Sequence, residues 1–159
     1  MPADSNQILI NVADLASGND GNGSGSDPTA APGAVIDIEE SALVGVRAFY
    51  SQPTTDPPAD GATLDVIVQV SVNGGSNYYP LVTFRQVLGS ELPDDEAAGD
   101  KTLRLGQVVK LPKADSGQSN KVKVRTNTVA STTTDWGLYV DIVAPEDVRA
   151  EWVENAIAT

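Results

Sequence analysis

The side chains that could do chemistry in this chain are carboxylates, hydroxyls and a few aromatic rings, because the sequence contains no histidine and no cysteine. Histidine is the commonest general base and metal ligand, and cysteine supplies thiolate nucleophiles and disulfides. What remains is catalysis by carboxylates or by an activated serine. Ser41 and Ser131 lack the glycine-flanked setting of a nucleophile elbow. The sequence therefore favours a protein that is not an enzyme and holds no cofactor.

A Gly- and Asp-rich stretch near the start of the chain matches part of a calcium-binding loop. Asp20, Asn22 and Ser24 occupy the first, third and fifth positions of the EF-hand pattern, and Gly25 occupies the sixth. The twelfth position requires a bidentate glutamate, and here it is Ala31. We interpret the stretch as a linker and predict no metal site.

Two clusters of carboxylates remain. Asp37, Glu39 and Glu40 could supply one side of a glycosidase pair, but no opposing acid can be identified. The second cluster lies in a long loop that contains a proline. A charged run of this kind is most often a solvated loop, and its alternative use is to bind a hard cation or a basic patch on a partner. The residues kept as candidates for partner binding are Asp94, Asp95 and Glu96.

Four aromatic residues, Tyr78, Tyr79, Trp136 and Tyr139, could form a platform for a sugar, although such residues more often pack inside a sandwich. Only one of Tyr78 and Tyr79 can point inward, because adjacent strand residues face opposite sides of a sheet. The outward tyrosine is a candidate for an interface, and we assign that role to Tyr79.

These residues need a scaffold, and the clearest scaffold signal is the alternation of apolar and polar residues in 64–72. The turn residues 73–76 and a second β-rich run follow it, which predicts a hairpin. The fold class predicted from the whole chain is an all-β antiparallel sandwich, similar to a jelly roll. Its strands are expected at 34–39, 43–50, 64–72, 77–84, 101–111, 121–128 and 136–143.

Three parts are expected along the chain. Residues 1–33 form an extended N-terminal arm with a Gly/Ser-rich linker, 34–144 form the sandwich, and 145–159 form a short C-terminal helix. A strand around 7–13 suits pairing with a neighbouring subunit, which would also order the linker. The apolar stripe of the C-terminal helix packs on its own sandwich or on a neighbour. The partner-binding residues predicted from these two segments are Ile8, Leu9, Ile10, Val12 and Trp152.

The balance of 22 acidic and 10 basic residues gives a net charge of −12. Such a charge repels nucleic-acid phosphates and anionic membrane surfaces, so neither is an expected partner. No run approaches the roughly 20 apolar residues that a membrane-spanning helix needs.

The hairpin sequence from Leu64 to Tyr79, an alternating strand followed by a Gly-Gly-Ser turn and an aromatic pair, resembles hairpins in small β-sandwich proteins of tailed bacteriophages. Together with the N-terminal arm it is similar to head decoration (cement) proteins. The resemblance implies a homo-oligomer, a trimer in preference to a dimer. It also implies binding to the major capsid protein on the outer surface of a virion, after synthesis in the host cytoplasm. Two alternatives remain open: a tail, baseplate or fibre-associated module, and a carbohydrate-binding module that uses Tyr78 or Tyr79 with Trp136.

Overall fold

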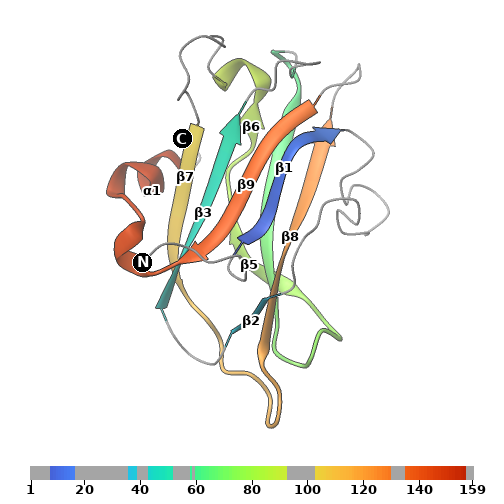
Figure 1. Cartoon of the computed structure of the whole chain (residues 1–159), viewed down its shortest axis with the longest axis vertical. Helices are drawn as coiled ribbons and strands as arrows, with labels where there is room; N and C mark the ends of the chain where they lie inside the picture. Colours follow the sequence, from blue (N-terminus) through green and yellow to red (C-terminus); the bar gives the residue numbers. More distant parts are fainter. Residues whose placement is uncertain are drawn as a thin grey trace.

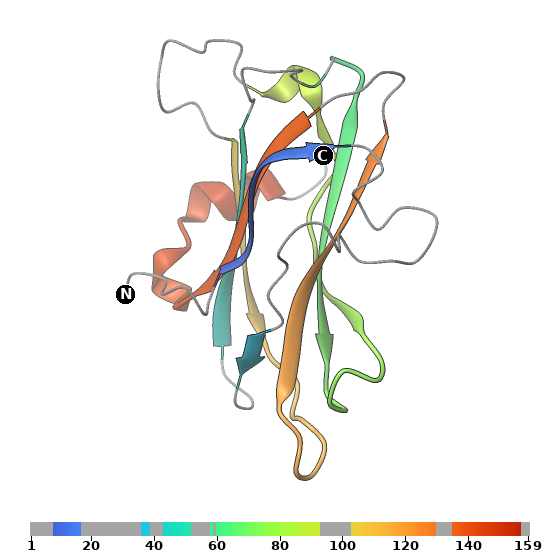
Figure 2. The ribbon, with the colours of Figure 1, turned by 45° about the vertical axis from the view of Figure 1, so that its right-hand side comes forward.

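The structure is a computed structural model that describes residues 8–16, 36–38, 43–51, 58, 60–92, 103–129 and 135–156. These residues form two antiparallel β-sheets followed by one short helix. Figure 1 looks through one sheet onto the other, and Figure 2 shows the two sheets as separate layers. The predicted class, an antiparallel β-sandwich with a short C-terminal helix, is confirmed.

The first sheet has the strand order β1-β9-β3-β7, and the second has the order β2-β8-β4-β5, with β6 also paired to β4. The strands of the first sheet are β1 (Ile8–Ala16), β9 (Asp135–Val143), β3 (Leu43–Ser51) and β7 (Leu103–Lys110). Those of the second are β2 (Ile36–Ile38), β8 (Asn120–Val129), β4 (Thr63–Ser71), β5 (Tyr79–Thr83) and β6 (Val87–Leu88). The helical elements are the 3-10 turns η1 (Gly89–Glu91) and η3 (Pro145–Asp147) and the helix α1 (Ala150–Ala156).

The strand pairing is that of one long hairpin rolled up on itself. β1 pairs with β9, β2 with β8, β3 with β7, and β4 with both β5 and β6. The first half of the chain is thus matched in reverse order against the second half. Two further ladders, β3 with β9 and β4 with β8, close the roll. This nested pairing over two sheets is the jelly-roll topology.

The core lies between the sheets and is built from the inward positions of the strands. On β4, Leu64, Val66 and Val68 are fully buried, whereas the residues between them are partly exposed. On β8, Val122 and Val124 are buried in the same alternating way. The period of two that the sequence predicted for these strands is confirmed. Burial of this aliphatic surface is the main stabilising contribution to such a fold.

The hairpin between β4 and β5 is closed by side chains as well as by glycine. Gly74 and Gly75 have φ angles of 74° and 94°, a region that disfavours any residue with a Cβ. The Ser71 hydroxyl accepts the Gly75 N–H at 2.9 Å, and the Asn73 side-chain oxygen accepts the Asn77 N–H at 2.9 Å. The turn predicted from the sequence is therefore present and tightly held.

The C-terminal segment is shorter and more broken than predicted. Instead of one helix over 145–159, η3 is followed by the extended residue Val148, with φ −98° and ψ 118°, and only then by α1. The reason lies in the sheet beneath, where Gly45 and Gly106 leave a depression that receives the Val148 side chain. A Cβ built on Gly106 would lie 2.7 Å from the Val148 Cγ1. This close contact holds Val148 against the sheet.

The N-terminal strand belongs to the sandwich and not to a separate arm. β1 is an edge strand that pairs with β9, and its Leu9 and Ile10 are fully buried in the core. The expected boundary, which placed all of 1–33 outside the sandwich, is therefore wrong for Ile8–Ala16. Residues 17–33 lie outside the described residues.

Candidate interaction surface

The outer face of the first sheet carries a connected group of polar and aromatic side chains. β3 directs Arg47 and Phe49 outward, because the residues on either side of them face the core. The register places Arg47 opposite Asp141 and Phe49 opposite Tyr139 on β9. Side chains directly opposite one another on antiparallel strands lie close enough to interact. The register therefore builds two cross-strand pairs side by side on this face.

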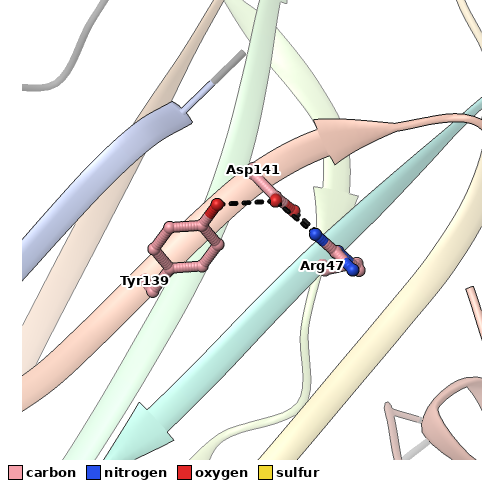
Figure 3. A network of polar contacts seen from close by, with 3 residues as sticks. All are labelled: Arg47, Tyr139 and Asp141. Atoms are coloured by element: carbon pink, nitrogen blue, oxygen red, sulfur yellow. Dashed lines mark hydrogen bonds and ion pairs between the residues drawn. The ribbon is translucent and has the colours of Figure 1, made fainter. Parts of the chain in front are cut away.

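Asp141 is the centre of the polar part of this group (Figure 3). The Arg47 Nε donates to Asp141 Oδ1 at 2.9 Å, and the Arg47 Nη2 donates to Oδ2 at 2.6 Å. The Tyr139 hydroxyl donates to the same Oδ2 at 2.8 Å. Asp141 is fully buried, while the Arg47 side chain is 20% exposed. A buried carboxylate is tolerated when both of its oxygens are paired in this way.

The titration of these groups indicates a structural role. Burial raises the pKa of Tyr139 to about 12, and the hydrogen bond to Asp141 and the charge of that carboxylate add to the shift. The hydrogen bond from Arg47 to Asp141 raises the arginine pKa further. Neither group changes its protonation near neutral pH. The network is therefore suited to holding β3 against β9 and not to proton transfer.

An aromatic cluster continues the group toward α1. The Phe49 and Tyr139 rings stack with centroids 5.8 Å apart, and the Trp152 ring meets Phe49 edge-on at 5.4 Å. The Arg104 guanidinium lies 5.7 Å from the Phe49 centroid. Trp152 is buried by this packing. Its predicted role as a partner contact is therefore wrong, because its indole already packs on its own sheet.

The described residues leave four large apolar side chains exposed. Tyr79, which the sequence assigned to an interface, is 54% exposed on β5, as that assignment requires. The neighbouring Tyr78 is partly buried, with the Lys123 Nζ 3.8 Å from its ring centroid. The sequence reasoning missed the other three exposed residues, which are Leu43 at 60%, Leu88 at 40% and Val108 at 41%.

The sequence does contain a pattern that could have predicted the exposure of one of these three residues. Val108 and Val109 are adjacent in a strand, so one of the two has to face outward. Val109 packs against the core, and Val108 lies on the outer face opposite Gly45. For Leu43 and Leu88, which lie at the beginning and end of their strands, the sequence offers no comparable pattern.

The predicted partner contacts on β1 are mostly internal. Leu9 and Ile10 are fully buried and Ile8 is half-buried, so the structure corrects the prediction for the first two. Val12 lies on the same strand, opposite Leu138 of β9, and its side chain is outside the described residues. The acidic candidates Asp94, Asp95 and Glu96 also lie outside the described residues.

One of the four aromatic residues considered for a sugar-binding platform is not at the surface. Trp136 is fully buried in the core between the sheets, so its ring cannot stack on a ligand at the surface. Tyr139 lies on the outer face of the first sheet, whereas Tyr78 contacts Lys123 of the second sheet. The four aromatic residues therefore do not form one platform.

Comparison with known proteins gives no relative: no family model, no curated protein and no solved structure matches the chain. Within the described residues, no three acidic side chains lie close enough together to hold a metal ion. Among those same residues, no helix has the length and apolar character needed to cross a bilayer. The features that the described surface presents are the polar group around Asp141 and the four exposed apolar side chains.

Proposed function

We propose that this chain is a non-enzymatic virion structural protein that decorates and stabilises the head of a tailed bacteriophage. In this role it binds the major capsid protein and neighbouring copies of itself on the outer surface of the capsid. The observation that carries the proposal is the β4–β5 hairpin with its exposed Tyr79, because this is the segment that resembles the phage sandwich proteins.

The geometry of this hairpin supports a binding role. Its turn is fixed by the side-chain hydrogen bonds of Ser71 and Asn73, so little conformational entropy would be lost when it docks. Tyr79 is the first residue of β5, and its side chain is more than half exposed. Tyrosine is one of the residues most enriched in the energetically dominant positions of protein interfaces.

The side chains that the structure leaves available for contact differ from those expected from the sequence. The buried side chains of Leu9, Ile10 and Trp152 stabilise the sandwich and are not available to a capsid. The candidates on the described surface are instead the four exposed apolar residues Leu43, Tyr79, Leu88 and Val108. Several weak contacts of this kind, repeated by symmetry over a capsid, add up to tight attachment.

The test is co-sedimentation of the purified chain with mature heads, and separately with tails, of the virus that encodes it. We expect saturable binding to heads, and we expect Tyr79→Ala to weaken it about tenfold or more. Thr83→Ala is the matched control, since Thr83 is exposed on the same strand, and it should change the affinity less than about twofold.

Each outcome decides between the candidate functions. Binding to tails and not to heads would overturn the decoration role in favour of a tail or baseplate component. Absence of binding to both, together with retention on a glycan array that Tyr79→Ala abolishes, would favour a carbohydrate-binding module instead.

A further inference from the structure

Two arginine side chains lie against one aromatic ring on the outer face of the first sheet. The Phe49 ring centroid is 5.2 Å from the Arg47 Cζ and 5.7 Å from the Arg104 Cζ. Arg104 is the residue directly opposite Phe49 in the β3–β7 ladder. The ring itself is held by Tyr139, which stacks on it, and by Trp152, which meets it edge-on. Both guanidinium groups therefore lie against a ring whose own position is fixed.

The arginines in and beside this aromatic cluster differ in whether they have a carboxylate partner. Arg47 binds both oxygens of Asp141. Arg149 pairs with Glu151 at 3.7 Å. Within the described residues, the Arg104 side chain makes no ion pair and no hydrogen bond. Of these three arginines, Arg104 is thus the one whose positive charge has no carboxylate beside it in the described part of the chain.

An arginine in this state is suited to bind an anion. Its planar guanidinium carries five N–H donors and can bind a carboxylate through two parallel hydrogen bonds. The contact with the Phe49 ring restricts the side chain without supplying an acceptor, so less conformational entropy is lost when an anion binds. Arg104 is partly exposed, which leaves it within reach of a partner. Arginine is also one of the residue types most enriched among the energetically dominant residues of protein interfaces.

The charge of the chain narrows the choice of anion to a protein carboxylate. The net charge of −12 repels polyanions such as nucleic acids. The chain itself supplies many carboxylates, since ten acidic residues but only one basic residue lie outside the described part. Four of those ten fall within positions 94–100, and Asp94, Asp95 and Glu96 are the longest acidic run in the sequence. A second copy of this chain therefore carries the kind of group that Arg104 lacks.

We propose that Arg104, held against Phe49, binds a carboxylate of the acidic run 94–96 of a second copy of this chain. The inference rests on the homo-oligomer in the proposed function, and it names a contact that forms this oligomer. Because the guanidinium of one copy receives a different segment of the next copy, the contact is heterologous, and such contacts build rings when the rotation between copies closes. A charge-assisted, bidentate pair of this kind is among the stronger polar contacts that a protein can make.

The first test compares two arginines with the same charge and similar ring contacts. Arg104→Gln and Arg149→Gln each remove one positive charge and one cation–π contact, since the Arg149 Cζ lies 5.5 Å from the Trp152 ring centroid. Arg149 is the matched control, because its side chain is 70% exposed and already pairs with Glu151. The dissociation constant of the oligomer, measured by sedimentation, should rise at least about tenfold for Arg104→Gln and change less than about twofold for Arg149→Gln. Circular dichroism of both variants establishes that they are folded.

The second test exchanges the charges of the two partners. Arg104→Glu places a carboxylate against the acidic run of the next copy, and a variant with Asp94→Lys, Asp95→Lys and Glu96→Lys places ammonium groups against Arg104. Each change alone should weaken self-association at least about tenfold, because like charges then face one another. Both changes in the same chain should return the dissociation constant to within about threefold of the original, because every contact again joins opposite charges.

Three results would overturn this contact. One is an equal effect of Arg104→Gln and Arg149→Gln on self-association. Another is a chain with both charge exchanges that assembles no better than the Arg104→Glu variant. The third is a chain that stays monomeric at every concentration. If the binding of such a monomer to heads depends on Arg104, the carboxylate belongs to the capsid protein and not to a second copy.

These outcomes are separable from those of the proposed function. An oligomer that depends on Arg104 but binds no heads would leave the contact standing and remove the decoration role. Binding to heads that requires Tyr79, by an oligomer that Arg104→Gln does not weaken, would keep the decoration role and remove the contact.

Discussion

Asp141 illustrates, at the scale of single residues, how an outward-facing position can still be fully buried. Two large side chains lie beside it: Arg47 is its cross-strand partner on β3, and Tyr139 is two residues away on β9 itself. Together they cover the carboxylate and satisfy both of its oxygens. A bidentate arginine pair combines two charge-assisted hydrogen bonds with fixed geometry, so it also specifies the register between β3 and β9.

We therefore expect Asp141→Ala to destabilise the protein by about 3 kcal/mol, because the mostly buried Arg47 guanidinium loses its acceptor. The measurement is the free energy of unfolding from urea denaturation. The control is Asp65→Ala, since Asp65 is a partly exposed carboxylate on an outer strand position that contacts Gln86 only at 3.3 Å. The control should cost less than about 0.5 kcal/mol.

A second readout separates loss of this network from general loosening of the fold. The Tyr139 pKa, about 12 in the intact protein, should fall toward its ordinary value of 10.0 when the neighbouring carboxylate is removed. The shift can be followed by ultraviolet absorbance, with Tyr139→Phe identifying which titration belongs to Tyr139. An unchanged titration in Asp141→Ala would contradict the role assigned to the carboxylate.

The sequence could not have predicted this network. Arg47 and Asp141 are 94 positions apart, and nothing in the local pattern around either residue links β3 to β9. Alternation along a strand can indicate which residues face outward, which is as far as a local pattern can reach. Partner choice depends on the strand order of the complete roll.

At the scale of elements, the sequence predicted best those segments whose conformation is decided by their own residues. The β4–β5 hairpin was predictable because positive φ angles at Gly74 and Gly75 require glycine. The C-terminal segment was not, because its break at Val148 depends on a depression formed by two glycines on distant strands. Val148 falls within the predicted helix, yet it packs on the sheet as an extended residue.

This dependence leads to a prediction for the helix. Gly106→Ala should destabilise the protein by about 1–3 kcal/mol, because the new methyl group would overlap Val148 and displace the segment that leads into α1. The matched control is Gly61→Ala, where an added Cβ meets nothing within 4 Å, so it should be nearly neutral. Adding Val148→Ala to Gly106→Ala should recover part of the loss in a double-mutant cycle measured by thermal unfolding. A strictly additive double mutant would show that the two residues do not compete for this space.

At the scale of the whole molecule, charge is distributed unevenly between the sandwich and the remaining segments. Ten of the 22 acidic residues, but only one of the 10 basic residues, lie outside the described residues. The described part of the chain therefore has 12 acidic and nine basic residues, a net charge of only −3. Most of the net negative charge of the chain is thus carried by residues outside the part that the structure describes.

The place of β1 in the roll shows what period-two alternation can and cannot establish. The pattern around Ile8, Ile10 and Val12 predicted a strand, and a strand is present. The same pattern suits a strand that pairs within its own chain and a strand that pairs with a neighbouring subunit, because in both cases one face of the strand is buried. The partner strand, β9, lies at the opposite end of the sequence, so only the complete topology could decide between the two.

Deletion of residues 1–16 should therefore unfold the sandwich and not merely prevent assembly. It would remove the fully buried Leu9 and Ile10, each of which contributes about 2–3 kcal/mol when buried. It would also leave β9 unpaired along one side. A loss on the order of 5 kcal/mol or more equals the whole stability of many domains.

Circular dichroism during urea titration is the measurement. Leu9→Ala should show a graded loss, and the half-buried Ile8→Ala a smaller one. A deletion variant that unfolds at the same urea concentration as the full chain would mean that β1 adds nothing to the roll, and would return it to the role of a free arm.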